Sequence, residues 1–157
     1  MAKSTKTEIV NALSDLLMDR RLDEITVTEL VERCGISRQA FYYHFSDLYG
    51  VVDYINKQLR EEAAGPPEED WRTVMGRTLN LLSEKRTVLL NAYRAYERSY
   101  VEHDLCRWAA PLIEARVQLA ARRYDVTQNQ ISLIADILTQ SMASGLLCWM
   151  FVGMSFL

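Results

Sequence analysis

Apolar residues recur every three or four positions along most of the chain, and no segment alternates with period two for long enough to indicate a sheet. Ile9, Leu13 and Leu17 form the first such stripe and predict a helix over about residues 6–20. Pro111 lies inside a later stripe, so a kink or a break is expected there. Further helices are predicted over about residues 48–62, 71–84, 87–99 and 104–124, and from 128 to the end of the chain. The pattern therefore predicts an all-α fold.

Two short helices joined by a tight turn are predicted within residues 25–45. Thr26 is a good N-cap for the first helix, and Glu29 three residues later completes a capping box. Gly35 ends this helix, because glycine readily takes the positive φ that a sharp turn needs, and Ser37 caps the second helix. This is the helix-turn-helix layout, in which the second helix enters the DNA major groove.

Side-chain spacing sorts the second short helix, residues 38–45, into two faces. Ala40, Phe41 and Phe45 fall toward the core. Arginine pairs with guanine O6 and N7 and glutamine with adenine N6 and N7, whereas tyrosine hydroxyls more often position phosphates. The outward face therefore suits a phosphate backbone and base edges, and it carries Arg38, Gln39, Tyr42 and Tyr43.

The same segment resembles the DNA-binding domain of the TetR/AcrR family of bacterial transcription regulators. The resemblance covers about residues 6–59, and it rests on the run T-V-T-E-L-V-E-R-C-G-I-S-R-Q-A-F-Y-Y-H-F. The continuation D-L-Y-G-V-V-D-Y-I also resembles a subgroup that includes regulators of dihydroxyacetone kinase operons.

The resemblance implies a role for each residue of the predicted DNA site. Tyr42 and His44 are expected to contact phosphate, and the groove side is expected to carry Ser37, Arg38, Gln39 and Tyr43. Thr26 and Thr28 are further candidates for phosphate contact, although capping alone explains Thr26.

The charge balance argues mildly against DNA binding. Residues 1–63 hold eight Lys or Arg and eleven Asp or Glu, whereas nonspecific DNA affinity depends on a basic surface. The family pattern commonly has a lysine at the start of the fourth helix, where this chain has Leu48. We therefore expect modest, salt-sensitive affinity that depends on dimerisation. The basic residues that must face DNA are Lys3, Lys6, Arg33, Arg38, Lys57 and Arg60.

The predicted organisation is an N-terminal three-helix domain followed by a C-terminal helical domain that binds a ligand and dimerises. Residues 1–47 form the helix-turn-helix domain, and residues 48–157 the regulatory and dimerisation domain, with the helix from Leu48 as connector. The clearest break lies at residues 64–70, because Pro66 and Pro67 cannot continue a helix. By resemblance, a shift of the connector changes the separation of two recognition helices.

The last predicted helix is apolar on nearly every side. From Ile131 onward its only formal charge is Asp136, and a helix of this kind is buried in protein or in lipid. The uninterrupted apolar run from Met142 is about 16 residues long, short of the roughly 20 that a membrane span needs. The better interpretation is a homodimer interface, because small residues allow close approach of another helix: Ser141, Ala143, Ser144 and Gly145.

Candidate ligand and catalytic chemistry is sparse. Six residues could line an effector pocket, although plain core packing is the simpler interpretation: Trp71, Met75, Tyr93, Tyr96, Tyr100 and Trp108. Tyr93, Tyr96 and Tyr100 are expected on one helix face. His44 and His103 lack partners at metal-ligand spacing, and no Gly-rich phosphate loop, G-x-S-x-G or C-x-x-C occurs. No enzyme activity, cofactor or metal is therefore expected.

Three widely spaced cysteines, Cys34, Cys106 and Cys148, suggest reduced core thiols in a cytoplasmic protein. No charged segment followed by an apolar one opens the chain, so no signal peptide is expected.

The sequence thus predicts a sequence-specific DNA-binding transcriptional regulator, a repressor, that binds double-stranded operator DNA as a homodimer. A small molecule or a partner protein at the C-terminal domain is expected to control it. Two alternatives remain, namely a protein-interaction module of the same fold with weak or lost DNA binding, and an unrecognised enzyme.

Overall fold

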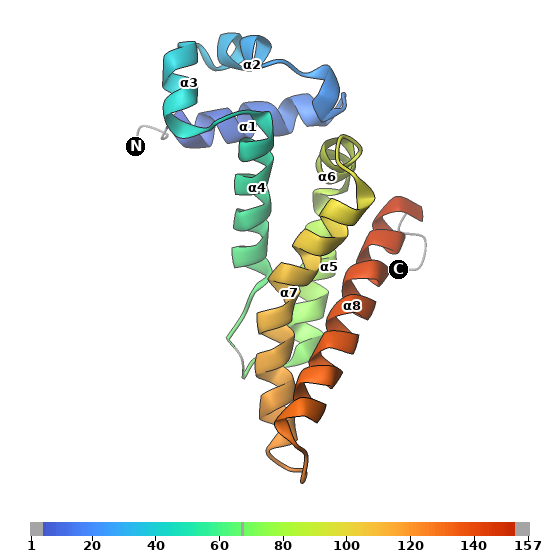
Figure 1. Cartoon of the computed structure of the whole chain (residues 1–157). Helices are drawn as coiled ribbons and strands as arrows, with labels where there is room; N and C mark the ends of the chain where they lie inside the picture. The colour runs from blue at the N-terminus through green and yellow to red at the C-terminus, as the bar shows by residue number, and fades with distance from the viewer. Residues whose placement is uncertain (1–4, 67, 153–157) are drawn as a thin grey trace. The chain divides into compact units, whose positions relative to one another are not determined.

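The computed structural model describes residues 5–66 and 68–152. Within these ranges the chain forms eight α-helices, one 3-10 turn and no strand, which confirms the predicted all-α class (Figure 1). The helices are α1 (Thr5–Leu17), α2 (Val27–Cys34), α3 (Arg38–His44), α4 (Leu48–Ala63), α5 (Trp71–Glu84), α6 (Arg86–Tyr93), α7 (Arg98–Ala121) and α8 (Gln128–Val152), and the 3-10 turn η1 is Leu22–Glu24. Two expectations lie outside the described residues, namely the orientation of Lys3 and the course of the last helix beyond Val152.

The predicted tyrosine face does not form, because α6 ends at Tyr93. The Tyr96 N–H donates to the Tyr93 carbonyl at 3.0 Å in a tight turn, and Glu97 then takes an extended backbone with φ −66° and ψ 137°. Tyr100 therefore lies on α7, which begins at Arg98, six positions before the expected start at residue 104. The spacing of the tyrosines continues across this turn, so the sequence pattern alone did not show that the helix ends at Tyr93.

Helix α7 continues through Pro111, so the break that the proline allowed does not occur. Ala109 and Ile113 on either side of the proline are buried together with Ala135 of α8. This packing holds both halves of α7 against α8 and compensates for the hydrogen bond that the proline removes.

One compact unit comprises the N-terminal segment through Glu62 together with Glu84–Tyr96. Its core is apolar and includes the fully buried Leu13 of α1 and Phe41 of α3. Helix α6 joins it from later in the sequence, since the Asn91 Nδ2 donates to the Leu17 carbonyl at 2.9 Å. By packing, therefore, α4 and α6 both belong with the first three helices. The predicted boundary after Asp47 divides the chain at a different place and stays a prediction about function.

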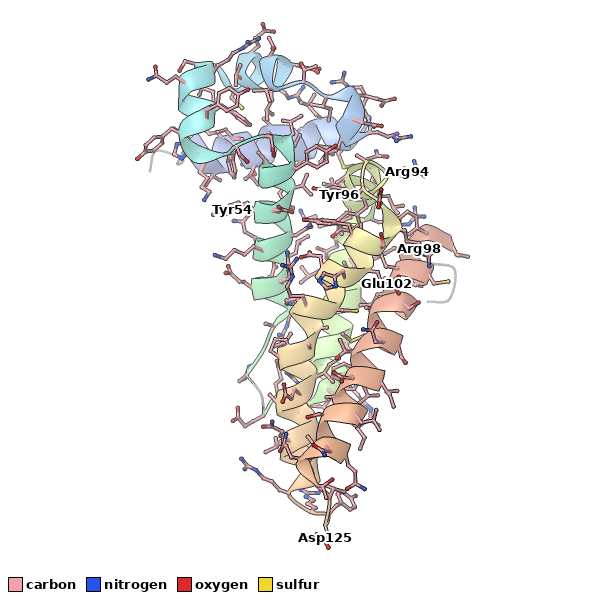
Figure 2. All side chains as sticks on the ribbon, in the orientation of Figure 1. Tyr54, Arg94, Tyr96, Arg98, Glu102 and Asp125 are labelled. Carbon is pink, nitrogen blue, oxygen red and sulfur yellow. The ribbon has the colours of Figure 1, made fainter. Side chains whose placement is uncertain are left out.

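The second compact unit comprises Ala63–Ser83 together with the chain from Glu97 onward. Helices α7 and α8 run side by side in it, joined by a turn that carries the labelled Asp125 (Figures 1 and 2). Thr127 begins α8 as expected, because its Oγ1 accepts from the Gln130 N–H at 3.4 Å while the Gln130 Oε1 accepts from the Thr127 N–H at 2.8 Å. This reciprocal pair is a capping box.

Helix α8 is buried on one side only. Its inner positions recur at helical spacing and include Ala135, Thr139, Ala143, Leu146, Leu147 and Met150. Its outer positions include large apolar side chains that are exposed in the single chain, namely Leu133, Ile134, Ile137, Leu138, Phe151 and Val152. The helix is long and apolar enough to cross a membrane by length and composition alone, a test that helices packed inside proteins also pass.

Candidate nucleic-acid interface

The turn between α2 and α3 forms as the sequence predicts. The Thr26 Oγ1 accepts from the Glu29 N–H at 3.2 Å, and the Ser37 Oγ accepts from the Ala40 N–H at 3.1 Å. Gly35 takes φ 66° and ψ 30°, the left-handed region that favours glycine, and its N–H closes α2. These three local features set the angle at which α3 leaves the turn.

Only half of the predicted capping box exists at α2. The Glu29 carboxylate, which was expected to reach back to the Thr26 N–H, instead pairs with the Arg20 guanidinium. A charged donor at the end of α1 binds the carboxylate in preference to a neutral amide, since charge-assisted hydrogen bonds are stronger. Glu29 therefore ties α2 to the chain that follows α1.

Helix α3 has one buried face and one exposed face, as predicted. Phe41 is fully buried, Phe45 is buried beside it with ring centroids 6.2 Å apart, and Ala40 is half-buried. Tyr42 is 57% exposed and Tyr43 84% exposed, which leaves both phenol rings available to a partner. Ser37, Arg38 and Gln39 at the start of the helix are exposed as well.

The structure brings two pairs of the predicted site residues together. The Arg38 Nη2 donates to the Thr28 Oγ1, so α2 positions the guanidinium at the start of α3. The His44 ring is half-buried and lies edge-on to Tyr43, with ring centroids 5.0 Å apart. Thr26 and Ser37 are exposed, and each hydroxyl oxygen accepts a hydrogen bond from a backbone N–H of its helix. The hydroxyl hydrogen of each residue takes no part in this capping bond. All eight predicted site residues thus lie on α2, on α3 or at their N-caps.

Several of the predicted DNA-facing cations have partners inside the protein. The Lys6 Nζ lies 3.9 Å from the centre of the Tyr54 ring, a cation–π contact, and Arg33 lies 3.7 Å from Asp15. Lys57 lies 3.7 Å from Glu61 one turn along α4. Arg38, by contrast, donates to the neutral hydroxyl of Thr28.

Leu48, where the family pattern commonly has a lysine, is a core residue. Its side chain is only 8% exposed at the start of α4. A lysine with this placement would bury a charge, which is costly unless the charge is paired. Leu48 therefore serves packing, and its side chain cannot make the phosphate contact that the resemblance implies for a lysine at this position.

The cysteines are free thiols, but they do not all lie in the core. Cys34 and Cys106 are half-buried, whereas Cys148 is exposed on α8, which corrects the expectation of three core thiols. Burial raises the pKa of Cys34, and the Glu8 carboxylate raises it further. Burial likewise raises the pKa of Cys106, with a smaller contribution from Glu102. Within residues 5–66 and 68–152, no group of three His, Cys, Asp or Glu side chains could hold a metal ion.

The second unit contains a cavity of about 550 Å³. Of the six predicted candidates, Trp71 and Met75 line it, and Trp108 lines a small adjoining cavity. Tyr93 and Tyr96 belong to the other unit. Sequence reasoning did not assign the remaining lining residues to a pocket, because most of them are ordinary apolar positions of α7 and α8 and because Arg116 and Ser141 stand in no local motif. These residues are Ile113, Arg116, Val117, Ala120, Leu138, Ser141 and Met142.

The fold and the exposed α3 place this chain among the helix-turn-helix DNA-binding proteins. Residues 9–54 match the family model for bacterial regulatory proteins of the tetR family. The match identifies residues 9–54, the part of the chain that the family model covers, as a helix-turn-helix domain of the tetR type.

The relatives that match are named as transcriptional regulators or repressors. The tetracycline repressor protein class C of Escherichia coli is 27% identical over 118 residues, which are 73% of this chain and 51% of the repressor. The probable HTH-type transcriptional regulator ArpR of Pseudomonas putida is 22% identical over 92% of this chain and 70% of its own. The uncharacterized HTH-type transcriptional regulator YxbF of Bacillus subtilis (strain 168) is 28% identical over 39% of this chain and 16% of its own. The chain thus spans about half or less of the length of YxbF and of the class C repressor.

A solved structure of similar fold is the dihydroxyacetone kinase operon activator DhaS. It superposes with a TM-score of 0.78 over 95% of this chain and 85% of its own, at 17% identity. A likeness at this identity shows the shared fold, so the predicted subgroup stays a prediction.

Proposed function

We propose that this protein is a sequence-specific transcriptional regulator that binds operator DNA through α3 as a homodimer. The observation that carries the proposal is the exposed surface of α3, which presents Arg38, Gln39, Tyr42 and Tyr43 while Phe41 anchors the helix in the core. Arginine and glutamine are the side chains that read guanine and adenine edges in the major groove. The protein would act in the cytoplasm, and no catalytic activity is part of the proposal.

The proposal assigns different tasks to the two kinds of side chain on α3. Tyr42 positions the backbone through phosphate, so Tyr42→Ala should weaken binding to operator and to random DNA alike. Gln39 reads a base, so Gln39→Ala should cost about 1–3 kcal/mol on the operator and relax the preference at one position. Fluorescence anisotropy with the upstream region of its own gene, at 50 and 200 mM salt, measures both effects.

The controls are built into the same experiment. Lys57→Ala removes a cation that already pairs with Glu61 and should leave binding nearly unchanged. Equal losses on both DNAs for the Tyr42 and Gln39 variants would overturn the division of tasks, and no binding at 50 mM salt would overturn the DNA-binding function itself.

The proposed dimer forms through α7 and α8. The outer row of α8 is a supporting observation, because it exposes six large apolar side chains in the single chain. Exposed apolar patches of this kind mark interaction surfaces. A two-fold dimer would present two α3 helices to half-sites about 34–36 Å apart, or a multiple of that distance.

We further propose that the direction of control is repression and that a small molecule in the second unit regulates it. The cavity of about 550 Å³ falls in the usual range for ligand sites. Two relatives are named tetracycline repressors, whereas DhaS is named an operon activator. A reporter fused to the operator tests the direction, since deletion of the regulator should raise expression under repression and lower it under activation.

A second candidate function is a protein-interaction module of this fold with weak DNA binding. The observation that favours it is the loss of free cations, because Lys6, Arg33 and Lys57 all have partners within the protein and Leu48 replaces a lysine. The anisotropy measurement separates the two, since this candidate predicts the same weak affinity for operator and for random DNA.

A further inference from the structure

We propose that the cavity of the second unit binds a small, mostly apolar molecule that carries one anionic group, and that Arg116 binds this group. The inference rests on the proposed function only in so far as ligand binding regulates the protein. The binding site itself is inferred from the residues that line the cavity.

The cavity wall is apolar except at Arg116 and Ser141. Trp71 and Met75 of α5, several aliphatic side chains of α7, and Leu138 and Met142 of α8 supply the apolar surface. Arg116 is the single titratable side chain among the nine lining residues. A wall of this composition selects a ligand with a large apolar body, and the guanidinium selects the charge that the ligand carries.

Arg116 lacks the negative partner that a sheltered guanidinium normally has. Its Nη1 donates to the Leu112 carbonyl at 3.0 Å and its Nη2 to the Pro66 carbonyl at 3.3 Å. Its Nε is buried and makes no hydrogen bond, and no ion pair of Arg116 occurs within the described part of the chain. Neutral carbonyls leave the positive charge uncompensated, so an anion in the cavity would both pair the charge and use the free donor.

Arg77, in the same unit, shows the contrasting arrangement. Its guanidinium pairs with the Glu69 carboxylate and also donates to the carbonyls of Ala63 and Ala64. Glu68 and Glu69 share an adjoining groove with Arg116 and Arg123, but Glu69 is held by Arg77 and Glu68 is exposed. The anion therefore belongs on the apolar cavity side of Arg116, away from these carboxylates.

The hydrogen bond from Arg116 to the Pro66 carbonyl connects the cavity to the segment that follows α4. Residues 63–66 are held by Arg77 and Arg116 through backbone carbonyls, and a Cβ at Gly65 would displace the carboxylate of Glu69. An anion that draws the guanidinium of Arg116 toward the cavity should lengthen the Nη2 contact with the Pro66 carbonyl. Ligand binding would thereby loosen one of the contacts that hold residues 63–66.

The test uses two matched pairs of probes, decanoate against decanol and 2-naphthoate against 2-naphthol, on the full-length protein as it exists in solution. Isothermal titration calorimetry measures the affinities, and tryptophan fluorescence gives a second readout, to which Trp71 in the cavity wall contributes. We expect at least one anion to bind at least ten-fold more tightly than its neutral partner. Arg116→Gln should abolish this preference.

Arg107→Gln is the matched control, because Arg107 lies on the same helix, is largely exposed and pairs with Asp104. It should keep the preference, and circular dichroism checks that all variants fold. The proposal is overturned if neither anion binds below millimolar concentration, or if Arg116→Gln keeps the preference. It is also overturned if probes bind only when the outer row of α8 carries Ile137→Glu, since a second copy of the chain would then fill the cavity.

Failure of this proposal and failure of the proposed function are distinguishable. Anion preference without operator binding would keep the site and remove its regulatory meaning. Operator binding without anion preference would keep the regulator and remove the anion site.

Discussion

Gly35 is the residue on which the geometry of the helix-turn-helix depends most directly. Its φ of 66° is strained for any residue with a Cβ, although nothing lies within 4 Å of the position that a Cβ would occupy. Gly35→Ala should therefore destabilise the protein by about 1 kcal/mol through the backbone alone. Thermal unfolding followed by circular dichroism measures the loss.

Two substitutions serve as controls for Gly35→Ala. Gly76 lies inside α5 with equally open space around it, so Gly76→Ala should stabilise the protein by about 0.5–1 kcal/mol. Gly35→Asn should cost less than Gly35→Ala, because asparagine tolerates the left-handed region. If Gly35→Ala and Gly76→Ala shift the melting temperature in the same direction, the backbone explanation is wrong.

At this scale the sequence was a good guide where the determinants are local. The caps at Thr26 and Ser37 and the turn at Gly35 depend on neighbours within three residues, and all three formed. The Glu29 carboxylate does not bond to the Thr26 N–H, because Arg20, nine residues earlier, binds it instead. Arg116 was missed because its significance depends on apolar neighbours from α5 and α8, which no local pattern reports.

Among the elements, α6 differs most from expectation, in both its length and its partners. The tyrosine stripe suggested a longer helix, and periodicity alone could not show that α6 packs with the N-terminal helices. Its attachment is specific, since the Tyr93 hydroxyl donates to the buried Asn56 Oδ1 at 3.0 Å and Asn91 caps the end of α1.

The tie between α6 and α4 can be measured by a double-mutant cycle. Tyr93→Phe removes the donor and leaves the Asn56 side chain buried without this partner, which should cost about 1–3 kcal/mol. In a background of Asn56→Leu the same change should cost much less, because no polar atom is then left unpaired. Urea unfolding of the four proteins gives the coupling energy, and a coupling near zero would contradict a direct hydrogen bond.

For the whole molecule, the exposed row on α8 predicts a dimer that one charge should disrupt. Ile137 is 56% exposed in the single chain, so Ile137→Glu should preserve the fold and favour the monomer. Analytical ultracentrifugation measures the state. Operator affinity should fall at least ten-fold in parallel, because a monomer reads one half-site only.

Gln128→Glu, which adds the same charge at the start of α8, is the control and should remain dimeric. Cys148 lies four turns from the start of the row and supplies an independent check, since it is exposed in the single chain and should resist alkylation in the dimer. A dimer that survives Ile137→Glu would place the interface elsewhere. The fold class and the helix-turn-helix followed from the sequence, whereas the interface depends on the surface that packing leaves uncovered.

Helix α6 packs with α1–α4 but is synthesised after α5, which affects how the chain folds during translation. Translation produces α1–α4 first, yet the hydrogen bonds to Leu17 and Asn56 wait for Asn91 and Tyr93, which come after the whole of α5. The first compact unit therefore completes its packing only after about thirty further residues have been translated. A nascent chain halted after α4 would expose the surface that α6 covers in the folded protein. A fragment that ends at residue 63 should accordingly aggregate or bind chaperones, because it lacks the contacts that Asn91 and Tyr93 make.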